Sequence, residues 1–184
     1  MTGIQWTTPL LCTIEGLLGP ADCDALIARS EALGYDAAPV TTDEGPVMMP
    51  ELRNNKRVIL DDTALADDLW SRVETSVAER LSGSHWHAVG LNERLRFYRY
   101  GPGQQFDWHR DGRFARSPVE ESRYTFMIYL NEGFAGGETL FRDLPGHDEV
   151  RITRAAAWRC CSTIHSAIAA QRWSADANMC CGRT

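Results

Sequence analysis

The sequence changes its periodicity after Gly90, and this change constrains the fold more than any other feature. Residues 95–100 alternate between side chains of different character, as a strand with two unlike faces does, and Gly101-Pro102-Gly103 forms a turn after them. Residues 106–111 also favour an extended conformation. The segment from Gly90 onward therefore predicts strands rather than helices.

Two further strands follow in the same part of the chain. Residues 124–130 are nearly all β-branched, aromatic or apolar, which is typical of a strand buried on both faces. Gly133 and the pair Gly136-Gly137 then indicate a turn before another strand over residues 138–141.

The first ninety residues show helical periods instead. Residues 21–33 are predicted to form a helix, with Pro20 in its first turn and Gly34 just past its end. The capping residues Asp61-Asp62-Thr63 predict a second helix that ends near Leu81, and it has apolar residues at i, i+4 spacing. Between the helices, residues 36–53 are rich in Pro, Gly and Thr and predict a loop, and residues 57–60 predict a short strand.

This order of elements predicts a mainly β fold with flanking α-helices. Helices followed by strands between glycine turns suggest a β-sandwich or jelly roll with helices packed on one side. The 184 residues are the size of one domain, and the 43% of apolar residues suffice for a core. We expect residues 1–90 to be a helical support and residues 91–184 to be the β core of the same domain.

The charge balance argues against a protein that binds nucleic acid through phosphate contacts, since 19 basic residues face 25 acidic ones. No apolar run approaches the length of a membrane span, and residues 1–11 lack the features of a signal peptide, so we expect a cytoplasmic protein. Four of the six cysteines form the adjacent pairs Cys160-Cys161 and Cys180-Cys181. Adjacent cysteines do not match the spacing of a zinc site, and we interpret them as buried or incidental thiols.

The strongest local chemical signal is the motif His109-Arg110-Asp111. Residues two apart on an extended segment face the same way, so His109 and Asp111 can direct a nitrogen and a carboxylate oxygen at one metal ion. A non-haem iron(II) oxygenase needs two histidines and one carboxylate on one side of the metal. The alternative is a surface turn with a solvated histidine and aspartate. Asp107 is also two residues from His109, so it would face the same way and is a competing carboxylate.

An ordered series of motifs surrounds this pair. It runs from residues 95–106 through His109-x-Asp111 and the segment 127–131 to Gly136-Gly137-Glu138-Thr139. The series resembles the prolyl 4-hydroxylase-like family of Fe(II)/2-oxoglutarate-dependent dioxygenases, over residues 91 to 154.

The resemblance implies a double-stranded β-helix, or jelly roll, that holds iron through His109, Asp111 and a more distal histidine. It also implies a tyrosine that touches 2-oxoglutarate, for which Tyr100 is the first candidate and Tyr98 the second; either could instead be a half-buried strand aromatic. The implied cofactors are Fe(II), 2-oxoglutarate and O₂, with ascorbate kept as a candidate. The implied reaction couples oxidative decarboxylation of 2-oxoglutarate to hydroxylation of a substrate C–H bond.

Residues 155–184 depart from this family pattern. The family places an apolar strand, the distal histidine and, ten residues later, a cation for 2-oxoglutarate in this region, whereas the segment shows no strand alternation. His165 is a candidate third ligand, but it lies three residues before the expected position. The competing interpretation is that His165 is an accidental histidine in a misread tail.

A shifted reading frame would restore the family pattern. Read from the third base of each codon, residues 156–163 allow an apolar strand, and a histidine codon can straddle Ala167 and Ile168. A lysine codon can straddle Ala177 and Asn178, ten residues later. We therefore hypothesise that residues 155–184 are translated out of frame, which would impair the chain as written.

Three functions stay open from the sequence. The first is a dioxygenase that acts on a peptide or a small molecule. The second is a non-catalytic jelly roll that binds a metal or a ligand. The third is a nucleic-acid-demethylating relative, against which the acidic charge and the lack of a basic stripe count. We expect no nucleic-acid or membrane partner, and the sequence does not predict the oligomeric state.

Overall fold

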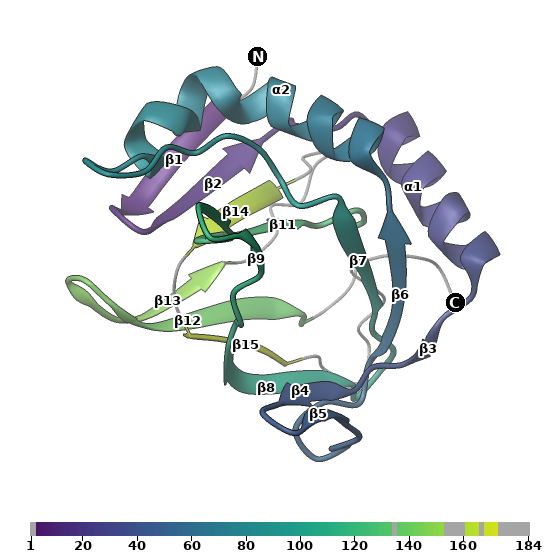
Figure 1. The fold of residues 1–184 in the computed structure, drawn as a ribbon. Helices are drawn as coiled ribbons and strands as arrows, with labels where there is room; N and C mark the ends of the chain where they lie inside the picture. Colours follow the sequence, from purple (N-terminus) through teal and green to yellow (C-terminus); the bar gives the residue numbers. More distant parts are fainter. Residues whose placement is uncertain (1–2, 134–135, 153–160, 166–167, 173–184) are drawn as a thin grey trace. The chain divides into compact units, whose positions relative to one another are not determined.

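The computed structural model describes residues 3–133, 136–152, 161–165 and 168–172 (Figure 1), with the last two ranges described as backbone strands. The chain divides into two compact units. The first comprises Met1–Val58 and Tyr98–Thr184, and the second comprises Ile59–Phe97.

Two four-stranded antiparallel sheets are the largest sheets of the first unit. One has the order β1-β2-β14-β11, and its strands are β1 Gly3–Thr8, β2 Leu11–Glu15, β14 Cys161–His165 and β11 Thr125–Ile128. The other has the order β13-β12-β15-β8, and its strands are β13 His147–Ile152, β12 Glu138–Leu144, β15 Ile168–Arg172 and β8 Gln105–Arg110. The chain passes repeatedly from one sheet to the other, because β8, β12, β13 and β15 belong to one and β11 and β14 to the other.

Smaller elements complete the first unit. Helix α1 spans Pro20–Leu33, and its N-terminus is capped by the carboxylate of Asp22, which accepts a hydrogen bond from the backbone N–H of Gly19. Two short hairpins have the pairs β4–β5 and β9–β10. Their bounds are β4 Val40–Thr42, β5 Gly45–Val47, β9 Ala115–Ser117 and β10 Glu120–Glu121.

The segment between β5 and β6 lies along strand β8. The backbone N–H of Asp107 donates to the carbonyl of Leu52 at 2.8 Å, and the N–H of Asn54 donates to the carbonyl of Gln105 at 3.1 Å. Arg53 and Phe106 form a β-bridge between these two hydrogen bonds. The segment therefore covers the side of β8 that does not pair with β15.

Helix α2, Thr63–Leu81, is the main element of the second unit. The side chain of Asp62 accepts a hydrogen bond from the N–H of Leu65 and so caps the helix. One face of the helix is buried, and it carries Ala66, Leu69, Val73, Val77 and Leu81. Strands β6 Lys56–Asp61 and β7 Arg94–Arg99 connect the two units along the chain. β6 pairs with β3, Asp36–Ala37.

The structure confirms both predicted helices and the strands predicted over residues 95–100, 106–111 and 138–141. The mainly β class with two helices is therefore confirmed. The strand predicted over residues 124–130 is β11, but its four residues are half-buried rather than buried, and only Tyr129 and Leu130 after it are withdrawn from solvent. The hairpin of β1 and β2 was not predicted, and the predicted loop over residues 36–53 contains three short strands.

Among the described helices, none is long and apolar enough to cross a membrane. The predicted boundary at residue 90 stays a prediction. Cys12 and Cys23 are buried and take part in no disulfide within the described part of the chain. Cys160, Cys180 and Cys181 lie outside the described residues and Cys161 is described only in its backbone, so the interpretation of the adjacent cysteines stays a prediction.

Candidate metal centre

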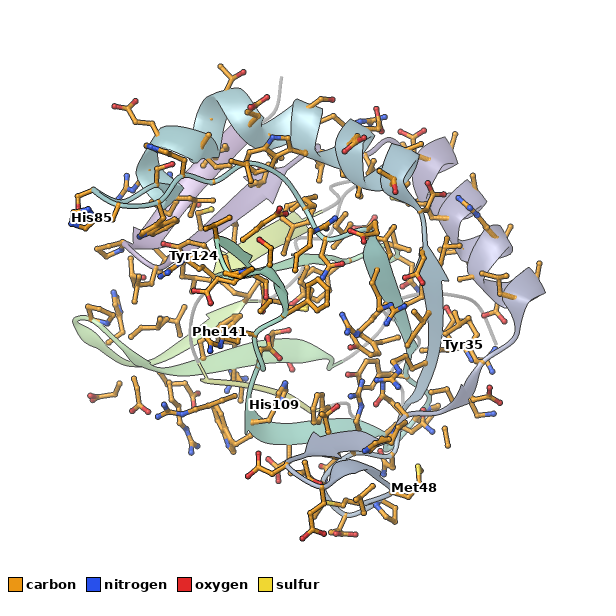
Figure 2. All side chains as sticks on the ribbon, in the orientation of Figure 1. Tyr35, Met48, His85, His109, Tyr124 and Phe141 are labelled. Atoms are coloured by element: carbon orange, nitrogen blue, oxygen red, sulfur yellow. The ribbon has the colours of Figure 1, made fainter. Side chains whose placement is uncertain are left out.

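The candidate site is built on strand β8, where Figure 2 labels His109. In the sheet, β8 pairs with β15, so that Ala169 lies opposite His109 and Ile168 lies opposite Arg110. Asp111 directly follows the strand. The extended backbone therefore puts His109 and Asp111 on the same side, as their spacing predicts.

A backbone contact orients the imidazole of His109. Its Nδ1 lies 2.7 Å from the carbonyl oxygen of Asp107. A carbonyl can only accept, so Nδ1 carries the proton and Nε2 keeps its lone pair in the neutral ring. This is the tautomer in which Nε2 can bind a metal ion.

The carboxylate of Asp111 faces that lone pair. Its Oδ1 lies 3.3 Å from Nε2 of His109. Bonds from a divalent ion to a histidine nitrogen or a carboxylate oxygen are about 2.0–2.2 Å, so two ligand atoms at right angles lie about 3 Å apart. The observed separation fits two neighbouring ligands of one ion.

A second contact holds the other oxygen of this carboxylate. The hydroxyl of Thr125, on β11, donates to Oδ2 of Asp111 at 2.6 Å. Oδ1 then stays directed at His109. Such outer contacts commonly set the orientation of a metal-binding carboxylate.

Asp107, the competing carboxylate, lies in a different environment. Its Oδ1 accepts a hydrogen bond from the backbone N–H of Trp108 at 2.9 Å. Its carbonyl, rather than its side chain, contacts the imidazole. The geometry therefore favours Asp111 over Asp107 as the partner of His109.

The third ligand is not found among the described side chains, which contain no group of three His, Cys, Asp or Glu residues able to hold a metal ion. For His165 the structure describes the backbone in β14, where it pairs with Thr125, and the side chain lies outside the description. The register thus puts His165 opposite the residue that holds Asp111.

The two candidate tyrosines lie in different environments. Tyr100 follows β7 and is 1% exposed, so it is a core residue of the first unit. Tyr98 is half-buried, and its ring centroid is 4.7 Å from the guanidinium carbon of Arg53. Tyr98 therefore lies next to a buried arginine.

Arg53 is the residue near this site that the sequence did not indicate. It is 4% exposed, and its guanidinium carbon lies 4.1 Å from the ring centroid of Phe106. The same ring stacks on the imidazole of His109, with 3.5 Å between the centroids and 13° between the planes. No pattern in residues 36–53 sets Arg53 apart, because its burial comes from the pairing of this segment with β8.

The antiparallel sheets and the His109–Asp111 pair define a β protein with a candidate metal site. Residues 95–179 match the family model described as the 2OG-Fe(II) oxygenase superfamily. This confirms the resemblance inferred from the sequence, and it indicates a 2-oxoglutarate-dependent oxygenase. The match includes His109 and Asp111 and extends into the atypical segment 155–184.

A solved structure gives the same result for the fold. The crystal structure of a prolyl-4-hydroxylase from Pseudomonas putida is similar with a TM-score of 0.58 and 17% identity, over 91% of this chain and 87% of that one. An oxidoreductase of the 2OG-Fe(II) oxygenase family from Burkholderia pseudomallei has a TM-score of 0.43 and 18% identity, over 86% of this chain and 73% of that one. A comparison with curated proteins gave no match.

Proposed function

We propose that this protein is an Fe(II)- and 2-oxoglutarate-dependent dioxygenase that hydroxylates a C–H bond of a peptide or a small molecule. The observation that carries the proposal is the 3.3 Å separation between Nε2 of His109 and Oδ1 of Asp111. Bound iron supplies the activation of O₂ that is coupled to the decarboxylation of 2-oxoglutarate to succinate and CO₂.

In this proposal His109 and Asp111 bind the iron ion, and neighbouring groups orient their side chains. His109 offers Nε2 because the carbonyl of Asp107 holds the proton on Nδ1. Asp111 offers Oδ1 because Thr125 holds Oδ2. The negative charge of Asp111 offsets part of the charge of a divalent cation, which a second neutral ligand could not do.

We also propose that the two four-stranded sheets form a double-stranded β-helix. The alternation of successive strands between the sheets supports this topology, since a jelly roll is wound in that way. Within it, Tyr100 is proposed to contact 2-oxoglutarate, with Tyr98 as the second candidate. The burial of Tyr100 is consistent with a residue at an enclosed site.

No third ligand is found among the described side chains, and we propose that a shifted reading frame supplies it. In the shifted frame a histidine falls at Ala167 and Ile168. Ile168 begins β15 and lies opposite Arg110, between His109 and Asp111 in the sequence. This register supports a histidine there as the third ligand, whereas His165 belongs to a strand of the other sheet.

Sequencing the coding DNA from codon 150 to the downstream stop tests the frame. A shifted frame that spells this histidine, and a lysine ten residues later, would support a complete site in the corrected protein. If sequencing confirms the frame as written, the proposed frameshift is contradicted and His165 is left as the remaining candidate for the third ligand. The family match in the written frame, which reaches residue 179, makes this second result a real alternative.

A second candidate function is a jelly roll that binds a metal or a ligand without turnover. It is favoured by one observation, that the described residues contain no group of three His, Cys, Asp or Glu side chains able to hold a metal ion. We propose the substrate only by its class, a peptide or a small molecule. The name prolyl-4-hydroxylase belongs to the solved Pseudomonas protein, whose 17% identity shows the fold alone.

The experiment compares matched carboxylate variants. Asp111→Asn and Asp107→Asn each remove one negative charge from the same strand region, and His109→Ala removes the imidazole. We expect Asp111→Asn and His109→Ala to abolish Mn(II) binding and the Fe(II)-dependent release of succinate from 2-oxoglutarate. Asp107→Asn should keep both.

Unchanged metal affinity in both Asp111→Asn and His109→Ala would rule out the metal assignment. Metal binding that depends on both residues but never leads to succinate would favour the non-catalytic candidate. Loss of binding in Asp107→Asn alone would show that Asp107 is the carboxylate ligand.

A further inference from the structure

The guanidinium of Arg53 is buried beside the candidate metal centre and lacks an anionic partner among the described residues. We propose that Arg53 binds a carboxylate group of a ligand through Nη2. This inference rests on the proposed function only for the source of the carboxylate, which would be 2-oxoglutarate or the primary substrate.

The hydrogen bonds of Arg53 leave this atom unused. Nε donates to Oδ1 of Asn55 at 2.9 Å, and Nη1 reaches the carbonyl of Pro39 at 3.5 Å. Nη2 is buried and has no hydrogen-bond partner among the residues that the structure describes. An arginine stays charged in proteins, and a buried charge without a counter-ion is costly, so such a group usually has a function.

Two other arginines of the first unit show what a structural arginine looks like here. Arg99 lies over the ring of Tyr35 at 4.6 Å and pairs with Glu31 at 2.7 Å. Arg142 lies over the ring of Trp108 at 3.6 Å and faces Glu149 at 3.7 Å. Arg53 makes the same contact with aromatic rings but has no described glutamate or aspartate beside it.

The position of Arg53 relates it to the metal site. One face of the Phe106 ring is covered by the imidazole of His109, at 3.5 Å. The guanidinium lies over the same ring at 4.1 Å, and both groups cannot occupy one face. Phe106 therefore separates Arg53 from His109, and the cation is one ring away from the candidate metal ligand.

These features select a carboxylate as the ligand group. A planar guanidinium matches a carboxylate in shape, and an anion also compensates the buried charge, which a neutral carbonyl does not. The proposed cosubstrate carries two carboxylates, and a primary substrate could carry one. Because Nη2 is buried, binding requires a neighbouring group to move aside.

The first test uses acetate and acetamide as probes on the protein without metal or 2-oxoglutarate. They differ in charge and hardly in size. We expect acetate, and not acetamide, to show saturation transfer in NMR with the unaltered protein. Arg53→Met should weaken acetate binding by about tenfold or more, because the charge-assisted hydrogen bonds are lost.

Arg99→Met is the matched control, since it removes an arginine that also lies over a ring but already has a glutamate. It should leave acetate binding unchanged. Arg53→Lys keeps the charge and removes the planar fork, so it should bind acetate with intermediate affinity. This variant also keeps the test valid if Arg53→Met does not fold.

The second test identifies the source of the carboxylate. With Mn(II) present and O₂ excluded, 2-oxoglutarate is added to the acetate-bound protein. Displacement of acetate by 2-oxoglutarate, and not by 2-oxopentanoate, would assign Arg53 to the distal carboxylate of the cosubstrate. Acetate that stays bound although 2-oxoglutarate binds would assign Arg53 to the primary substrate.

The proposal is overturned if acetate and acetamide bind alike, or if acetate binds equally to the unaltered protein and to folded Arg53→Met. Because the first test needs neither metal nor turnover, a failure of the dioxygenase proposal would not be mistaken for a failure at Arg53.

Discussion

Nε2 of His109 lies 3.3 Å from Oδ1 of Asp111, and each of the two groups is held by a contact on its other side. The carbonyl of Asp107 holds Nδ1 of the imidazole, and the hydroxyl of Thr125 holds Oδ2 of the carboxylate. The pair is therefore oriented without an ion, which would lower the cost of ordering the ligands in the proposed metal site.

Thr125→Val should weaken metal binding. The change removes the hydroxyl that donates to Asp111 and keeps the volume of the side chain. Loss of such an outer contact typically lowers metal affinity by about 10- to 100-fold. Mn(II) titration followed by calorimetry measures the effect, and Thr125→Ser should retain most of the affinity. Equal affinities in Thr125→Val and the unaltered protein would show that the hydroxyl does not position Asp111.

Phe106→Leu should also weaken metal binding, by a smaller factor. The ring of Phe106 stacks on His109, and aromatic stacking contributes about 0.5–1.5 kcal/mol, which corresponds to roughly 2- to 12-fold in affinity. The same titration measures it. Phe106→Tyr keeps the ring and serves as the control, so an equal loss in both variants would argue against stacking as the cause.

Leu69→Ala should destabilise the second unit. Leu69 is 3% exposed on the buried face of α2, and removing a buried leucine side chain costs about 2–5 kcal/mol. Urea unfolding followed by circular dichroism gives the free energy. Arg72→Ala, on the exposed face and paired with Asp68, should change it by less than about 1 kcal/mol. A loss of similar size in both variants would contradict the assigned burial.

The Asp61–Arg94 ion pair predicts a pH dependence of stability. A hydrogen bond from Arg94 lowers the pKa of Asp61 below its ordinary value of 3.8. A carboxyl whose pKa is lower in the folded state stabilises that state above the unfolded pKa, and the contribution disappears as the pH falls through the folded value. Both groups are exposed, so the effect is small and weakens with salt.

Asp61→Asn should therefore melt at a lower temperature than the unaltered protein at neutral pH and at the same temperature well below pH 3.8. Glu74→Gln, which removes one exposed charge from α2, is the control for net charge. A melting difference for Asp61→Asn that is constant across this pH range would exclude the ion pair as its origin.

Local patterns in the sequence were sufficient for both helices and for several of the strands. The capping residue Asp62 and the apolar positions of α2 lie within one helix, so the period and the start of the helix can be recognised without tertiary information. The same holds for His109 and Asp111, since two residues separated by one position on a strand share a face wherever that strand lies.

The choice between Asp107 and Asp111 depended on contacts that the spacing from His109 cannot predict. Both have the right spacing from His109, but the carboxylate of Asp107 bonds to the N–H of Trp108, and the carboxylate of Asp111 meets Thr125 of β11. The burial of Arg53 was missed for a similar reason. Arg53 is buried only because its segment lies along β8, and this pairing joins parts of the chain about fifty residues apart.

The sequence by itself therefore determined both helices, several of the strands and the residues that can point at one metal ion, because those properties depend on neighbours along the chain. Only the tertiary structure decided which carboxylate faces His109, which hydroxyl supports it and which arginine is buried behind Phe106. Each of these depends on contacts between distant segments, and no local period in the sequence encodes such contacts.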